Sequence, residues 1–380
     1  MIPLAVPNIS GNEGLYLQEC VRSNFVSSVG PFVGRLETMC AEAAGADHAV
    51  ATSSGTTGLH LALTAVGVKP HDLVIAPAFT FIASANAISH CTASPWLFDI
   101  NPDDWTLDPD LVRAELRAHA QRKGADWIHR PSGRRIAAVL PVDTLGHPAD
   151  MDALNAIAAE YGLPLVADAA AALGARYKRS KIGSLATLSV MSFNGNKTVT
   201  AGGGGMICGN DAALMRWVRH LSTTARAGLD YEHDAVGFNY RMTNLQAAVG
   251  CAQMERLDEF VEAKRRIDER YRVGLAGLPG VGFFPVASWA VSACWFSGVV
   301  LEQSARHDVR SLCALLRDRG IEARTFWKPI HLQKPYGNCP RTKMSVCEDI
   351  WYRILTLPCS TSLSDADQEF VIATLRELLT

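Results

Sequence analysis

The sequence lacks the features of a membrane-spanning or secreted chain. No stretch approaches the roughly 18 unbroken apolar residues that a transmembrane helix needs, and no basic segment followed by an apolar one opens the chain. The 36 Lys and Arg residues nearly balance the 38 Asp and Glu residues, so net charge gives no general attraction to nucleic acid or acidic membranes. We therefore expect a cytoplasmic protein that binds neither, and in which any anion recognition is local.

The ten cysteines do not form the patterns of a metal site. None belongs to a Cys-x-x-Cys pair and none lies in a His-rich cluster. The sequence therefore predicts no metal and reduced thiols, many of them buried, in a reducing compartment. The chain also has no internal repeat and no low-complexity tract.

Short apolar runs alternate with segments of helical period between about residues 49 and 208. This alternation is typical of an α/β fold whose mostly parallel sheet is covered on both faces. The predicted strands are 48–54, 73–79, 93–100, 135–143, 163–169 and 187–193. The predicted helices are 58–67, 81–90, 108–120 and 150–162. The polar, basic segment 118–135 is predicted to be a solvated surface excursion.

The pattern of apolar residues changes after Asn210. Longer helical patterns cover 211–223 and 242–271, and mixed helical and strand-like segments follow from about residue 280. We expect a large α/β domain over 1–250, including an N-terminal arm, and a smaller C-terminal α+β domain over 251–380.

Polar residues that follow the apolar runs are the first candidates for a site, because ligands bind beyond the carboxyl ends of parallel strands. Ser54, Gly55 and Thr56 open a helix, where free N–H groups and hydroxyls can bind a phosphate, although taken alone an ordinary N-cap is the favoured interpretation. Asp168 ends a strand among small apolar residues, where a buried carboxylate needs a partner. It can be interpreted either as a cofactor ligand or as a helix cap. Asp143 also ends a strand, where capping or turn formation is the favoured interpretation.

The stretch "SFNGNKTVTAGGGG" contains the most informative residue. Lys197 follows the strand that ends at Ser192, and Gly202–Gly205 leave the neighbouring chain without side chains. A lysine in a crowded, partly desolvated pocket has a lowered pKa and can form a Schiff base. A phosphate cup, an aspartate and such a lysine at strand ends together match the needs of pyridoxal 5'-phosphate. The glycines do not form the G-x-G-x-x-G of a dinucleotide loop.

The order of motifs resembles the DegT/StrS group of pyridoxal-phosphate aminotransferases that act on nucleotide-linked keto sugars. The motifs include "SSGTTGLHLAL", "APAFTFIASANAI", "VADAAAALGA", "SFNGNKTVTAGGGGMI" and "VGFNYRMTNLQAAVG", and they span nearly the whole chain. These motifs are most similar to those of the branch that aminates UDP-linked 4-keto-6-deoxy-N-acetylhexosamines on the routes to legionaminic acid and bacillosamine. The resemblance implies the type I aminotransferase fold.

The same resemblance implies roles for individual residues. Lys197 would bind the cofactor covalently and move protons, and Asp168 would keep the pyridine nitrogen protonated. Gly55, Thr56 and Ser192 would hold the phosphate, beside Ser54.

Two further residues would complete the cofactor site. Asn239 would reach the phosphate in a neighbouring subunit, which makes the expected unit a homodimer with shared active sites. Phe79 would lie against the cofactor ring.

Substrate candidates are Ser27 in "FVSSVGPFV" and Arg324, Trp327 and His331 in "ARTFWKPIH", where an ordinary surface loop is an equally good interpretation. Three positions depart from the family: Ala171 replaces a usual Gln, His or Glu, Asp143 a common His, and Phe25 a frequent Trp.

The resulting hypothesis is transfer of an amino group from L-glutamate to the 4-keto carbon of a nucleotide-linked 4-keto-6-deoxy sugar for surface polysaccharide or nonulosonate synthesis. The alternatives are an aminotransferase like GDP-perosamine synthase and a non-catalytic sensor of the sugar or cofactor. A sugar dehydratase of the same fold is disfavoured, since such relatives carry histidine in place of Lys197.

Overall fold

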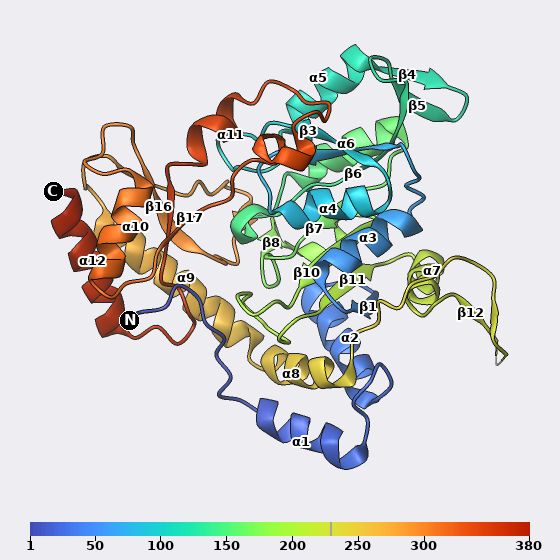
Figure 1. Ribbon diagram of the computed structural model, residues 1–380, viewed down its shortest axis with the longest axis horizontal. Coiled ribbons are helices and arrows are strands. Elements are labelled where there is room, and N and C mark those ends of the chain that lie inside the picture. The colour runs from blue at the N-terminus through green and yellow to red at the C-terminus, as the bar shows by residue number, and fades with distance from the viewer. Residues whose placement is uncertain (229) are drawn as a thin grey trace.

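The computed structural model describes residues 1–228 and 230–380. Figure 1 shows a central sheet covered by helices and, beside it, a smaller unit of strands and helices from the C-terminal part of the chain. Both chain ends lie at this smaller unit.

The central sheet is mostly parallel, as the sequence predicts. Its seven principal strands are, in spatial order, β1 (His48–Thr52), β11 (Gly205–Gly209), β10 (Leu188–Ser192), β7 (Val166–Asp168), β6 (Arg134–Val139), β2 (Leu73–Pro77) and β3 (Ser94–Phe98). Only β11 among them runs antiparallel to its neighbours β1 and β10, and this strand was not predicted. Bridges from Val139 to Leu165 and from Val142 to Asp168 join β6 to β7.

Helices cover both faces of the sheet, as expected for strands that are apolar on both sides. They are α1 (Glu13–Ser23), α2 (Pro31–Ala44), α3 (Gly55–Ala65), α4 (Ile82–His90), α5 (Pro109–His119), α6 (Met151–Tyr161), α7 (Ala212–Ser222) and α8 (Asn244–Met254). All five residues of β2 are buried, which explains why its sequence does not alternate. The predicted helices of this half are therefore confirmed within a few residues.

Short elements connect the longer ones in both domains. The predicted surface excursion forms a hairpin of β4 (Ala120–Lys123) and β5 (Asp126–His129), and β5 pairs with the start of β6. Two-residue strands outside the two main sheets are β8 (Arg176–Tyr177), β9 (Ser180–Lys181), β12 (Arg226–Ala227), β13 (Glu232–His233) and β15 (Ala290–Val291). Single 3-10 turns are η1 (Thr144–Gly146), η2 (Ile182–Ser184), η3 (Ile330–Leu332) and η4 (Lys334–Tyr336).

The smaller domain has an antiparallel sheet in the order β14 (Val281–Phe283), β16 (Ser297–Leu301), β18 (Ile354–Leu357) and β17 (Arg324–Thr325). Its helices are α9 (Leu257–Leu275), α10 (Val309–Asp318), α11 (Ser345–Ile350) and α12 (Asp365–Leu379). The first residues of the chain pack here, since Ile2 N donates to Gly320 O (2.7 Å) and Leu4 O accepts from Cys359 N (2.7 Å). The predicted boundary at residue 250 lies inside α8.

A buried lysine ties the long helix α9 to the small-domain sheet. Lys264 is 3% exposed, and its ammonium donates to Trp295 O (3.0 Å) and Cys359 O (2.6 Å). A buried ammonium is costly unless such acceptors compensate it. These bonds hold the backbone of Trp295, just before β16, in a defined position.

Across residues 1–228 and 230–380, no helix combines the length and the apolar character required to cross a membrane.

Candidate active site

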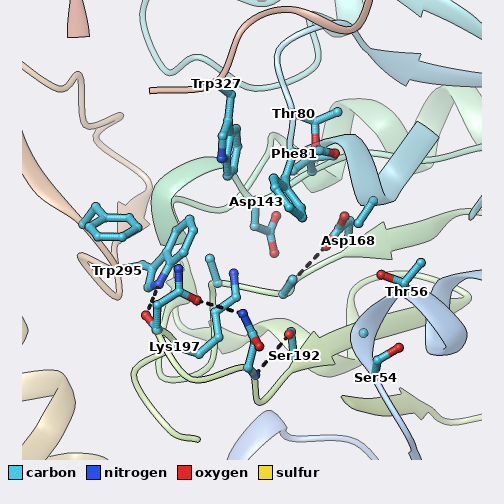
Figure 2. A pocket seen from close by; sticks show the side chains of 18 of the residues that line it. Ser54, Thr56, Thr80, Phe81, Asp143, Asp168, Ser192, Lys197, Trp295 and Trp327 are labelled. Atoms are coloured by element: carbon cyan, nitrogen blue, oxygen red, sulfur yellow. Dashed lines mark hydrogen bonds between the residues drawn. The ribbon is translucent and has the colours of Figure 1, made fainter. Parts of the chain in front are cut away.

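A cavity of about 470 Å³ lies at the carboxyl ends of the parallel strands. Figure 2 shows that side chains following β1, β6, β7 and β10 face it. The small domain closes the other side with Trp295, Phe296 and the segment from Arg324 to Trp327. Residues from both domains therefore enclose one site.

The start of α3 forms an anion cup. The Ser54 hydroxyl accepts from Thr57 N (3.1 Å) and so caps the helix. Gly55 and Thr56 begin the helix, where N–H groups lack intrahelical partners and attract anions. Ser192 lies directly opposite, because a Cβ added to Gly55 would stand 3.0 Å from Ser192 Cβ. The cup therefore combines backbone N–H groups with the hydroxyls of Thr56 and Ser192.

Gly205 allows this cup to form. A Cβ at this position would meet Gly55 N and the Ser54 carbonyl at 2.7 Å, which no real side chain tolerates. The antiparallel strand β11 can thus pack directly against the first turn of α3. Gly205 is needed for this close backbone approach.

Asp168 is held as an acceptor at the end of β7. Ser84 Oγ donates to Oδ2 (2.6 Å) and Ala170 N donates to Oδ1 (3.1 Å). Burial raises the pKa of the Asp168 carboxyl above its usual value, while these two hydrogen bonds and the charge of Lys197 oppose the rise. The carboxylate is therefore well placed to pair with a protonated nitrogen.

Lys197 lies on the cavity wall against the Trp295 ring. Its Nζ is 3.6 Å from the ring centroid, and the indole Nε1 donates to Asn196 O (2.7 Å). Although Lys197 retains some exposure to the cavity, burial by the surrounding protein lowers the pKa of its amine from 10.5 to about 8, and Asp168 opposes this shift. About a tenth of the amine is therefore neutral and nucleophilic at pH 7, far more than for a lysine with the ordinary pKa of 10.5.

Most predicted site residues meet in this cavity. Those that line it are Ser54, Gly55, Thr56, Asp168, Ser192, Lys197, Arg324 and Trp327. The Arg324 guanidinium pairs with Glu322 (2.5 Å) at the cavity mouth, and its side chain is 67% exposed.

The prediction for Phe79 is not supported. Phe79 is fully buried and packs against Trp105, Phe326 and Trp327 in the core. Phe81, two residues further on, is 55% exposed and lines the cavity instead. Both lie in the turn between β2 and α4, so the aromatic motif alone could not distinguish them.

Three other candidates lie outside the cavity of this chain. Asn239 and Ser27 are exposed, and the Ser27 carbonyl accepts from Asn244 N (2.6 Å). His331 is buried, and its Nε2 contacts Glu348 Oε1 at 2.8 Å. The predicted substrate role of His331 therefore has no geometric support, and the shared-site role of Asn239 stays a prediction.

Sequence reasoning missed several residues that position the chemistry. Ser84 holds Asp168, and Trp295 covers Lys197, although they lie 84 and about 100 residues from their partners. Thr80 also lines the cavity. No local pattern marks these residues, because packing between distant elements places them.

The residues present fit pyridoxal 5'-phosphate. The anion cup suits its phosphate, Asp168 suits its pyridine nitrogen, and the low-pKa Lys197 suits its aldehyde. The fold and this donor set define a pyridoxal-phosphate-dependent aminotransferase.

Comparison with known proteins gives the family. Residues 7–376 match the DegT/DnrJ/EryC1/StrS aminotransferase family, and the chain belongs to it. EpsN from Bacillus subtilis, assigned as a pyridoxal phosphate-dependent aminotransferase, is 37% identical to this protein. The aligned region covers 99% of this chain and 95% of EpsN. GDP-perosamine synthase from Caulobacter vibrioides is 37% identical over 100% of this chain and 98% of its own. The crystal structure of DesI with its TDP-sugar product has a TM-score of 0.87 at 30% identity, covering 99% of this chain and 92% of that one.

The lowered pKa of Lys197 predicts an early plateau in the pH dependence of cofactor attachment. The visible absorption band formed when pyridoxal phosphate is added to the cofactor-free protein should appear faster as pH rises to about 9 and then at a nearly constant rate, because the amine is almost fully neutral one pH unit above its pKa. Stopped-flow absorbance measures this, with Lys197→Ala as the control that forms no band. A rate that keeps rising beyond pH 9 would show that the amine is not desolvated.

Proposed function

We propose that the protein transfers an amino group from L-glutamate to the 4-keto carbon of a nucleotide-linked 4-keto-6-deoxy sugar, with a UDP-linked N-acetylhexosamine as the favoured acceptor. The observation that carries the proposal is Lys197, a low-pKa amine in the same buried cavity as Asp168 and the anion cup. A sensor that only holds its ligand has no need of such an amine.

Each residue has a defined task in this proposal. The bound cofactor supplies the electron sink for the reaction. Asp168 Oδ1 and Oδ2, fixed by Ala170 and Ser84, keep one negative charge opposite a protonated ring nitrogen. In the first half of the cycle Lys197 Nζ would accept the proton from the amine-bearing carbon of the donor and deliver it to the cofactor, and in the second half it would move a proton from the cofactor to the sugar carbon. Trp295 keeps the released amine beside the reacting centre and away from bulk water.

The sugar substrate is supported by the shape of the site and by the relatives. The cavity extends beyond the cup and Lys197 to an open mouth with Arg324 and Trp327, which offer a cation and an aromatic face to a diphosphate and a base or sugar ring. DesI was solved with a TDP-sugar product. A GDP-linked acceptor is the second candidate, since similar proteins are named GDP-perosamine synthase.

A spectroscopic assay tests the reaction. L-Glutamate should bleach the visible band of the holoenzyme, and one 4-keto nucleotide sugar from a UDP, GDP and dTDP panel should restore it with release of an amino sugar. Lys197→Ala should lower turnover by at least about 1000-fold, because both covalent attachment and proton transfer depend on this amine. Wild-type turnover in Lys197→Ala, or no response to any amino donor, would contradict the proposed function.

The proposal includes a homodimer with shared sites. Asn239 is exposed and outside the cavity of its own chain. The segment after α1 exposes Phe25 (46%), Val26 (44%) and Val29 (60%), an apolar surface suited to a second copy. Asn239 would then donate to the phosphate held in the partner's cup.

Mixed dimers test the shared site. Lys197→Ala and Asn239→Ala subunits should each be nearly inactive alone. A heterodimer purified through two different affinity tags contains one site with both residues intact, so it should recover about half of the wild-type activity. Failure to obtain any dimer, or an inactive heterodimer, would contradict the shared arrangement.

A further inference from the structure

Two buried acidic residues lie on adjacent backbone segments of the cavity wall. The segments that carry them are joined by Asp143 N donating to Asp168 O (3.0 Å) and Asp168 N donating to Pro141 O (2.8 Å). Asp143 is 4% exposed and Asp168 is 6% exposed, and both line the cavity. Figure 2 shows both among the side chains around Lys197.

The cavity does not provide enough positive charge for both carboxylates. In the described chain, the cationic side chains lining it are Lys197 and Arg324. Arg324 is mostly exposed and already pairs with Glu322, so the buried part of the site holds one cation against two carboxyl groups. Two neighbouring acids in such surroundings do not both ionise at neutral pH.

The hydrogen bonds decide which acid keeps the charge. Asp168 accepts from Ser84 Oγ and from Ala170 N, whereas the hydrogen bond found for the Asp143 carboxyl in the described chain is the one from Ala149 N to Oδ1 (3.1 Å). Burial, reinforced by the charge of Asp168, raises the pKa of the Asp143 carboxyl to about 7, and the Ala149 bond opposes this only partly. The second oxygen, Oδ2, is thus available to carry the proton.

We propose that Asp143 acts in the aminotransferase site as a neutral carboxylic acid, so that the single negative charge stays on Asp168. In this role Asp143 is a positioning residue: its Oδ2 donates a hydrogen bond to an acceptor oxygen of the bound cofactor. Ala170 and Ala171, which follow Asp168 along the same wall, have no side-chain donor to take this part. Asp143 therefore supplies a side-chain donor that Ala170 and Ala171 cannot supply.

Ionisation of Asp143 has a defined consequence. It adds a second negative charge to the wall of a site that must hold an anionic phosphate and removes the donor. The other ionisable groups near it are accounted for: Asp168 and Lys197 line the cavity, Arg324 lies at its mouth, and His147 follows in the same turn. His147 Nε2 accepts from Ala287 N (2.9 Å), and burial lowers the pKa of its imidazole to about 4, so it stays neutral above pH 6.

The test compares cofactor affinity with pH in the wild type and in Asp143→Asn, which cannot ionise. The ratio of the wild-type Kd for pyridoxal phosphate to that of Asp143→Asn should rise about tenfold between pH 6 and pH 8, because the competent, protonated fraction of Asp143 falls by that factor. Lys197 titrates equally in both proteins and cancels in the ratio. The control variant is Asp103→Asn, which removes an exposed carboxylate after β3. The ratio of the wild-type Kd for pyridoxal phosphate to the Kd of this variant should not change with pH.

Infrared difference spectroscopy of the wild type provides a second, independent measurement. A protonated carboxylic acid band should be present in the holoenzyme at pH 6, weaken by pH 8 and be absent from Asp143→Asn. A flat Kd ratio together with no such band would overturn the proposal. The inference rests on the proposed cofactor site but not on its substrate, so this failure would leave the Lys197 and amino-donor assays untouched.

Discussion

Desolvation of one amine is the constraint on which the rest of the site depends. Lys197 can serve as a nucleophile because protein surrounds it and lowers its pKa to about 8. That environment requires both domains. Strand ends of the large domain bring Lys197 and Asp168 together, while the small domain supplies the Trp295 ring over Nζ. Lys264, itself buried, anchors the backbone of Trp295 and so connects the small-domain sheet to the reacting amine.

A second constraint is electrostatic balance within the same wall. Burial penalises every charge, yet the site needs one stable carboxylate and one anion cup. The structure meets this by giving Asp168 two hydrogen-bond donors and placing the cup at a helix N-terminus, where backbone N–H groups replace side-chain cations. Gly205 makes this possible, since any side chain there would collide with the first turn of α3. Gly205 and the buried acids therefore belong to one electrostatic arrangement, in which each buried negative charge is compensated by hydrogen-bond donors.

Sequence periodicity predicted what local rules control. The buried strands and the helices between them are confirmed because two-sided burial leaves a clear apolar pattern, and Ser54, Asp168, Ser192 and Lys197 were found because each lies at or just after the end of a predicted strand. β11 was missed because it begins within the glycine run, where side-chain pattern is absent. Phe79 and Phe81 could not be separated, since the turn between them decides which ring faces the cavity.

The missed residues Ser84 and Trp295 show where sequence reasoning ends: contacts across the fold place them, and nothing in their local sequence marks them. Asp143 could be predicted only in part from the sequence. Its predicted turn role is confirmed by the hydrogen bond from Ala149 N, but its place beside Asp168 depends on the join between β6 and β7.

The proposed function depends on Lys197 as the residue to which the cofactor is attached. Borohydride reduction of the holoenzyme followed by peptide mapping tests it directly, because reduction fixes the cofactor on the lysine that holds it. We predict one modified peptide, carrying the cofactor on Lys197, with activity lost in proportion to modification. Stoichiometric label on any other lysine, with Lys197 unmodified, would contradict the account.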